Sequence, residues 1–168
     1  NRILENRLPD SELVSRLQSQ VAGSINLHTA GGIVDGETLP LVTSLVEVVP
    51  LDDTSQHHLI DQFKKLGLAS EIHKLTDKII ADAVNSRKES VGDQVWKEIV
   101  RFAYLSAIDN LWVDHLDAMD DMRTGVGLRA HGQRDPLVEY KQEAFSMFEK
   151  LVAQIDMEFS RRLLRIHA

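Results

Sequence analysis

Cysteine is absent from the 168 residues of this chain, which excludes disulfide bonds and metal sites built on thiolates. Aromatic residues make up only 5% of the sequence, so aliphatic residues must form most of any core. This composition favours helices over a β-sandwich. No apolar run comes near the roughly 20 residues that a membrane-spanning helix needs.

Positive charge is also scarce: the chain has 19 Lys and Arg and 26 Asp and Glu, which gives a formal net charge of −7. General nucleic-acid binding and polybasic membrane anchoring both need a basic surface, so neither is predicted. The patterns G-x-x-x-x-G-K-[ST], G-x-G-x-x-G and G-x-S-x-G do not occur in the chain. We therefore predict no catalytic residue and no cofactor-binding residue.

The first part of the chain is punctuated by proline and glycine. Residues 1–7 are expected to end a helix ahead of Pro9, because the residue before a proline avoids the α region. A new helix is expected to follow a capping residue at Asp10 and to stop at Gly23. Residues 24–36, which contain paired glycines, are expected to form a loop.

Residues 37–49 leave two alternatives open. Pro40 suits the first turn of a helix, whereas the density of β-branched residues suits a strand, and we favour the helix. Residues 56–66 are predicted to form a helix that Gly67 ends. Residues 72–88 have the apolar spacing of a further helix.

Two long segments with helical periodicity dominate the second half. The apolar residues of the first segment advance in steps of three and four: Val95, Ile99, Phe102, Leu105, Ile108, Trp112, Leu116, Met119 and Met122. Those of the second segment do the same: Leu137, Tyr140, Ala144, Met147, Leu151, Ile155, Phe159 and Leu163. Residues 125–136 break the pattern, and Asp135 and Pro136 suit the cap and first position of the second helix.

A short connection makes two such helices antiparallel neighbours. We therefore predict an all-α fold, in which a long antiparallel two-helix hairpin is joined to a small, mostly helical domain.

An acidic run within the first long segment is the strongest metal candidate: Asp114, His115, Asp117, Asp120 and Asp121. Three of its carboxylates share one helix face and could in principle clamp a divalent cation. The alternative, which we favour, is the solvated back of a helix whose apolar front is Trp112, Leu116 and Met119. The histidines His28, His57 and His58 lack the spacing of a metal site, so no metal is predicted.

Three arginines, Arg123, Arg129 and Arg134, gather around the break between the two segments. They indicate either ordinary solubility or a tip that contacts an anionic or peptide-like partner. The glycines of the break would permit close approach of such a partner. The residues by themselves leave both readings open.

Residues 111–148, LWVDHLDAMDDMRTGVGLRAHGQRDPLVEYKQEAFSMF, resemble the C-terminal helical region of SecA, the motor ATPase of bacterial preprotein translocation. The matching residues span both long segments and the break: Leu111, Trp112, His115, Leu116, Met119, Asp120, Arg123, Gly125, Leu128, Arg129, Gln133, Asp135, Pro136, Glu139, Tyr140, Lys141, Glu143, Phe145, Met147 and Phe148. A match this dense is far more specific than a short motif.

The resemblance implies a layout for the whole chain. Residues 1–7 would end the long scaffold helix, residues 8–92 would form the helical wing domain, and residues 93–168 would form the two-helix finger of the helical scaffold. The finger's tip would contact the translocating polypeptide at the mouth of the SecY channel. The matching tip consists of Leu128, Arg129, Ala130, His131, Gly132, Gln133 and Arg134. Many family members have a tyrosine at the tip, whereas His131 keeps a planar ring but changes charge near neutral pH.

The resemblance also implies partners: the preprotein substrate, the SecY channel complex and the remaining SecA domains. ATP and Mg²⁺ would bind nucleotide-binding domains that have no counterpart here, so this chain by itself is not expected to be an enzyme. It would be cytoplasmic and peripheral at the cytoplasmic face of the membrane, held there through the channel. The start at Asn1, without an initiator Met, leads us to expect a piece of a longer protein. The rival hypothesis is a free-standing helical adaptor for protein–protein interaction.

Overall fold

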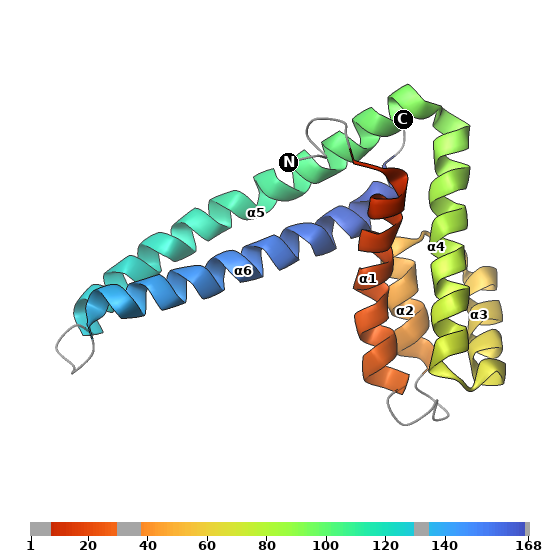
Figure 1. The fold of residues 1–168 in the computed structure, drawn as a ribbon, viewed down its shortest axis with the longest axis horizontal. Helices are drawn as coiled ribbons and strands as arrows, with labels where there is room; N and C mark the ends of the chain where they lie inside the picture. The colour runs from red at the N-terminus through yellow and green to blue at the C-terminus, as the bar shows by residue number, and fades with distance from the viewer. Residues whose placement is uncertain (1–7, 30–37, 130–134, 167–168) are drawn as a thin grey trace. The chain divides into compact units, whose positions relative to one another are not determined.

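The computed structural model describes residues 8–29, 38–129 and 135–166. In these ranges the protein has six α-helices and no strand (Figure 1), which confirms the all-α prediction. None of the described helices combines the length and the apolar character that crossing a membrane requires. The expected helix end at residues 1–7 lies outside the described residues.

Helix α1 spans Asp10–Thr29, so the predicted stop at Gly23 and the predicted loop from residue 24 are wrong as far as Thr29. The core-facing positions Leu13, Leu17, Val21 and Ile25 continue at a spacing of four through the glycine, and all are buried. Glycine inside a helix costs about 1 kcal/mol relative to alanine. Burying Ile25 recovers roughly 1.5–3 kcal/mol, which outweighs that cost. The rest of the predicted loop, residues 30–36, lies outside the described residues.

Helix α2 spans Thr38–Val48, which confirms the favoured alternative for this segment. Leu41, Val42, Leu45 and Val48 are buried at helical spacing, and α2 packs against both α1 and α3. Burial of this apolar face outweighs the small helix penalty of the β-branched residues, because propensity is a weak local preference.

Helix α3 spans Asp53–Leu66, and its ends follow the local chemistry of the sequence. The Asp52 carboxylate accepts a hydrogen bond of 2.7 Å from the Ser55 backbone N–H. This hydrogen bond holds the pKa of Asp52 below its ordinary value, because it favours the ionised carboxylate. At the other end, Gly67 has φ 65°, the left-handed conformation that closes many helices.

Helix α4 spans Ala69–Val91 and packs against α1 and α3. Its buried residues Ile72, Thr76, Ile80 and Val84 recur every four positions. Gly92 follows with φ 82° and donates its backbone N–H to the Lys88 carbonyl at 2.8 Å. The predicted helix over residues 72–88 is confirmed, and it extends beyond the predicted range at both ends.

The two long helices are α5, Asp93–Arg129, and α6, Pro136–Leu163. α5 continues through Gly125 and Gly127, so the break between the helices is shorter than the predicted residues 125–136. Asp135 caps α6 as predicted, since its side-chain oxygen accepts the Leu137 backbone N–H at 2.9 Å.

The chain divides into two compact units. One consists of residues 1–103 and 160–168, with a core formed by α1 to α4 and by buried residues at the start of α5 such as Trp96. The other consists of residues 104–159, the greater part of the α5–α6 pair. The predicted domain limits, 8–92 and 93–168, follow the family resemblance and stay a prediction.

Candidate functional site

In the unit formed by residues 104–159, α5 and α6 lie side by side (Figure 1). The rings of Tyr104 in α5 and Phe159 in α6 meet edge to face, with centroids 5.6 Å apart and planes inclined by 81°. Such edge contacts between rings are favourable beyond the area they bury. Further along the pair, a hollow of about 300 Å³ is lined by both helices, including His115 and Lys150.

The seam between these helices is made of residues that are buried in the unit. α5 contributes Ala107, Met122 and Val126, and α6 contributes Leu151, Ile155 and Phe159. The side chain of Ala107 is small and fully buried. The pair is therefore a packed structure in which each helix supports the other.

The predicted apolar front of α5 is wrong at its centre. Trp112 is 45% exposed and Leu116 is 50% exposed, although both belong to the predicted stripe. Met122, at the end of the predicted stripe, is buried, and so is Ala107, which lies outside that stripe. Apolar residues at helical spacing occur on both faces here, so the pattern alone could not tell the packed face from the open one.

The same unit exposes further large apolar side chains along both helices: Leu105, Val113, Leu137, Val138, Phe145, Phe148, Val152 and Met157. Contiguous exposed apolar surface commonly marks a place where another protein surface packs.

The predicted tip lies only partly within the described residues. Leu128 and Arg129 belong to the last turn of α5, whereas Ala130, His131, Gly132, Gln133 and Arg134 lie outside them. The role of the tip residues therefore stays a prediction. α5 ends at Arg129 and Asp135 caps α6.

The acidic run on α5 does not form a metal site in the described part of the chain, where no three His, Asp or Glu side chains come close enough to hold an ion. Asp120 instead forms an ion pair with Arg123 at 2.7 Å. Both side chains are about 70% exposed, so this pair is solvated and adds little stability. The Trp112 and His115 rings lie 5.8 Å apart between centroids.

Two of the histidines that the sequence analysis considered, His28 and His57, lie in α1 and α3. His28 lies in the last turn of α1 and not in the predicted loop. His57 Nδ1 lies 2.7 Å from the Asp53 backbone oxygen one turn earlier. Among the described residues, neither histidine belongs to a group of three His, Asp or Glu side chains that could hold a metal ion.

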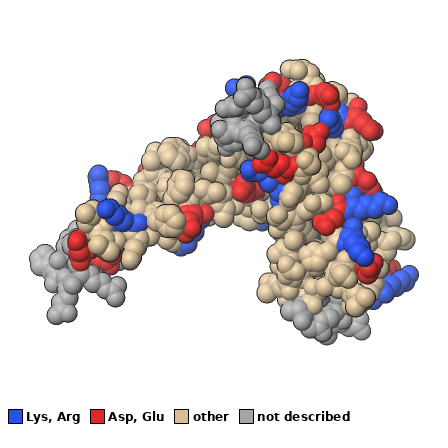
Figure 2. Space-filling model, viewed as in Figure 1, with Lys and Arg blue, Asp and Glu red and all other residues tan. Residues whose placement is uncertain are grey.

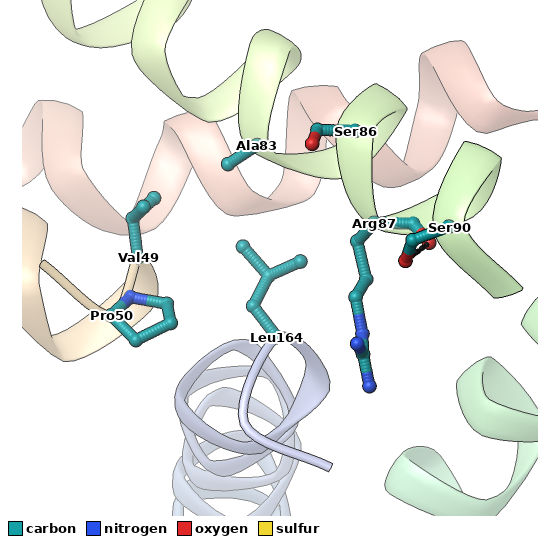
Figure 3. Close-up of a pocket in the computed structure, with 7 residues that line it drawn as sticks. All are labelled: Val49, Pro50, Ala83, Ser86, Arg87, Ser90 and Leu164. Carbon is teal, nitrogen blue, oxygen red and sulfur yellow. Dashed lines mark hydrogen bonds between the residues drawn. The ribbon is translucent and has the colours of Figure 1, made fainter. Parts of the chain in front are cut away.

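The other unit contains a small pocket of about 280 Å³, drawn in Figure 3, that the sequence analysis did not anticipate. Val49, Pro50, Ala83 and Leu164 form its apolar wall, and Ser86, Arg87 and Ser90 of α4 line the remainder. Arg87 Nη2 donates to the Ile166 carbonyl at 2.6 Å. The guanidinium thus fastens the chain just past α6 to α4.

A second attachment of the same segment involves α2. Arg161 Nη2 lies 2.9 Å from a Glu47 carboxylate oxygen, and the Arg165 guanidinium donates to the backbone carbonyls of Val46 and Glu47. These carbonyls belong to the last turn of α2, where a cation meets the negative end of the helix dipole. The sequence signal for this attachment is the run of basic residues near the C-terminus. Such a run indicates the end of a helix, but it does not indicate that α2 is the helix it contacts.

A third polar contact joins three helices of this unit. Lys88 Nζ lies 2.7 Å from Asp10 and 3.1 Å from Asp93. The hydrogen bonds to Asp10 and Asp93 raise the pKa of Lys88, because both favour the charged ammonium. The start of α1 is thereby tied to the junction of α4 and α5.

Comparison with known proteins gives consistent results. Residues 5–167 match the family described as the SecA wing and scaffold domain. The protein translocase subunit SecA of Heliobacterium modesticaldum is 40% identical over 115 residues, which is 64% of this chain and 14% of the relative. That of Alkaliphilus oremlandii is 36% identical over 145 residues, 80% of this chain and 16% of the relative. That of Carboxydothermus hydrogenoformans is 48% identical over 80 residues, 48% of this chain and 9% of the relative.

This chain thus spans about a sixth or less of the length of these relatives. The family match, by contrast, extends over nearly all of its residues and includes all six helices. With its helical fold and its long α5–α6 pair, the chain belongs to the SecA wing and scaffold domain family.

Proposed function

We propose that this chain serves protein translocation by presenting the tip, Leu128–Arg134, to a translocating preprotein and to the SecY channel. The observation that carries the proposal is the dense match to the SecA pattern across residues 111–148, which spans the ends of both long helices and the tip between them. Relatives named as translocase subunits agree with a role in translocation.

The α5–α6 pair is mechanically suited to such a task. Its seam residues, such as Ala107 and Leu151, are buried. Packed interiors have low compressibility, so a displacement of one end of the pair is passed along it with little loss. The tip would therefore follow movements imposed on the bases of the helices.

Those movements would originate outside this chain. ATP and Mg²⁺ would bind the nucleotide-binding domains of the complete SecA protein, and the chain would act as the connection between them and the preprotein. Its membrane association would be peripheral, at the cytoplasmic face, and would depend on the SecY channel.

Site-specific photocrosslinking tests the proposal. A photoreactive amino acid replaces His131 in the complete SecA protein, which is mixed with vesicles containing the SecY channel, a preprotein and ATP. The control carries the same probe at Ala153, an exposed α6 residue about 25 Å along the helix from Pro136.

The expected result is capture of the preprotein or SecY from position 131 at several times the yield obtained from position 153. Capture of neither from position 131, in a preparation that translocates the preprotein, would contradict the proposed role of the tip.

A further inference from the structure

We infer that the surface between α3 and α4 is a docking groove for an acidic, amphipathic helix of another polypeptide. This groove, the α3–α4 groove, consists of two adjoining hollows of about 510 and 340 Å³. Gln62 lines both hollows, which therefore adjoin at this residue. The proposal concerns the unit that does not contain the tip.

The groove has an apolar floor because of how α3 is oriented. Leu59 and Phe63 of α3 point into the core, and α3 packs on α2 and α4. Leu66 of α3 and Leu75 of α4 both line the larger hollow. Leu51 and Ile79 continue this apolar lining in the smaller one.

Lysines surround the larger hollow. Lys65 of α3 and Lys74 and Lys78 of α4 line it, with Glu71 as the single acidic residue among the lining side chains. Lys74 and Glu71 form an exposed ion pair at 3.0 Å. Figure 2 shows Lys and Arg side chains interspersed with Asp and Glu over the α3 and α4 region of this unit. The lining of the larger hollow thus has three lysines and one glutamate, in a chain whose net charge is −7.

The shape and the charge of the groove together indicate which kind of partner segment it binds. An apolar furrow between two helices accepts the apolar face of a third helix, which is a common mode of peptide recognition. α3 has 14 residues, so a partner helix of three to four turns, about 21 Å long, would fill the furrow. The lysine end of the furrow favours acidic residues on the flanks of that helix, because complementary charges speed and orient association.

A membrane surface fits the groove less well. Membrane-binding basic patches typically have about 4–8 Lys or Arg residues, whereas three line this hollow. The apolar residues here also line a furrow, and insertion into a bilayer requires apolar groups that protrude.

The test measures binding of a fluorescent probe peptide to the 168-residue chain by fluorescence anisotropy. The probe is a 14-residue stapled helix with leucines on one face and glutamates on the flanks. A peptide of the same composition with scattered leucines is the peptide control. The groove variant is Lys65→Glu with Lys78→Glu. The matched protein control is Lys97→Glu with Lys141→Glu, two exposed lysines outside the groove that change the net charge equally.

We expect saturable binding of the amphipathic probe and at least fivefold weaker binding of the scrambled peptide. The groove variant should weaken probe binding about tenfold, a loss of roughly 1.4 kcal/mol. The protein control should change it less than about twofold, since exposed charges away from the site are screened. Circular dichroism should show the same helix content for all three proteins.

Three outcomes would overturn the inference. The first is the absence of saturable probe binding. The second is an equal loss of probe affinity in the groove variant and the control variant. The third is binding of the chain to vesicles rich in anionic lipid that the groove variant abolishes while its binding of the probe persists. None of them bears on the tip, because crosslinking from His131 concerns the α5–α6 pair and not α3 and α4.

Discussion

Leucine-to-alanine substitutions at Leu116 and Leu151 separate the packed face of the α5–α6 pair from its open face. Both leucines belong to the apolar stripes that the sequence predicts, and both lie in the unit of residues 104–159. Leu151 is only 3% exposed, whereas Leu116 is 50% exposed. The two substitutions delete the same atoms, so any difference between them reports burial.

The magnitudes follow from that difference. Removing a buried leucine side chain typically costs about 2–5 kcal/mol, because lost transfer free energy adds to the cost of the cavity. Full burial of leucine is worth roughly 1.5–3 kcal/mol, so a half-exposed leucine that leaves no closed cavity should cost about 1 kcal/mol. Leu151→Ala should therefore destabilise the unit at least twice as much as Leu116→Ala.

Hydrogen exchange followed by mass spectrometry is a suitable assay, because it reports the opening free energy of α5 and α6 separately from that of the other unit. The measurement uses the 168-residue chain, in which the Leu116 face is open to solvent. Equal losses of protection in the two variants would refute the assignment of the seam. A larger loss for Leu116→Ala would show that the predicted stripe through Trp112 is the packed one.

Three further predictions concern the other unit. Gly67→Ala should lower the free energy of unfolding by about 1 kcal/mol in urea titrations, since φ 65° is left-handed and the added methyl meets nothing within 4 Å. Asp52 has a lowered pKa, so its stabilisation is present above pH 3.8 and is lost as the pH falls through the folded-state pKa. Asp52→Asn should abolish that part of the acid dependence, followed by circular dichroism between pH 5 and 2. Glu47→Gln should cost less than about 1 kcal/mol because its ion pair with Arg161 is half exposed, and the cost should shrink in 1 M salt.

Each of these three has a clear contrary result. Unchanged stability of Gly67→Ala would mean that the backbone there tolerates a side chain. Acid unfolding that is identical with and without the Asp52 charge would exclude the cap as its source. A cost for Glu47→Gln that is independent of salt would show that packing, and not charge, holds that contact.

The parts of this fold that the sequence predicted well are those governed by local chemistry. Asp135 caps α6 because a carboxylate can reach the backbone N–H two residues ahead, whatever the rest of the chain does. Gly67 ends α3 because glycine adopts positive φ without steric cost. The helical class of residues 38–48 and the family resemblance across residues 111–148 were likewise accessible from the sequence.

What required the tertiary structure is the choice of which surfaces meet. Gly23 lies inside α1 because Ile25 beyond it is buried in the core, a long-range gain that no local rule contains. Trp112 and Leu116 have the spacing of core residues yet lie exposed, whereas Ala107, which lies outside the predicted stripe, is buried. The α3–α4 groove exists only where side chains of two helices are brought together. Periodicity determines that a helix has an apolar face, whereas burial depends on the partner that packs against it, and only the folded chain supplies that partner.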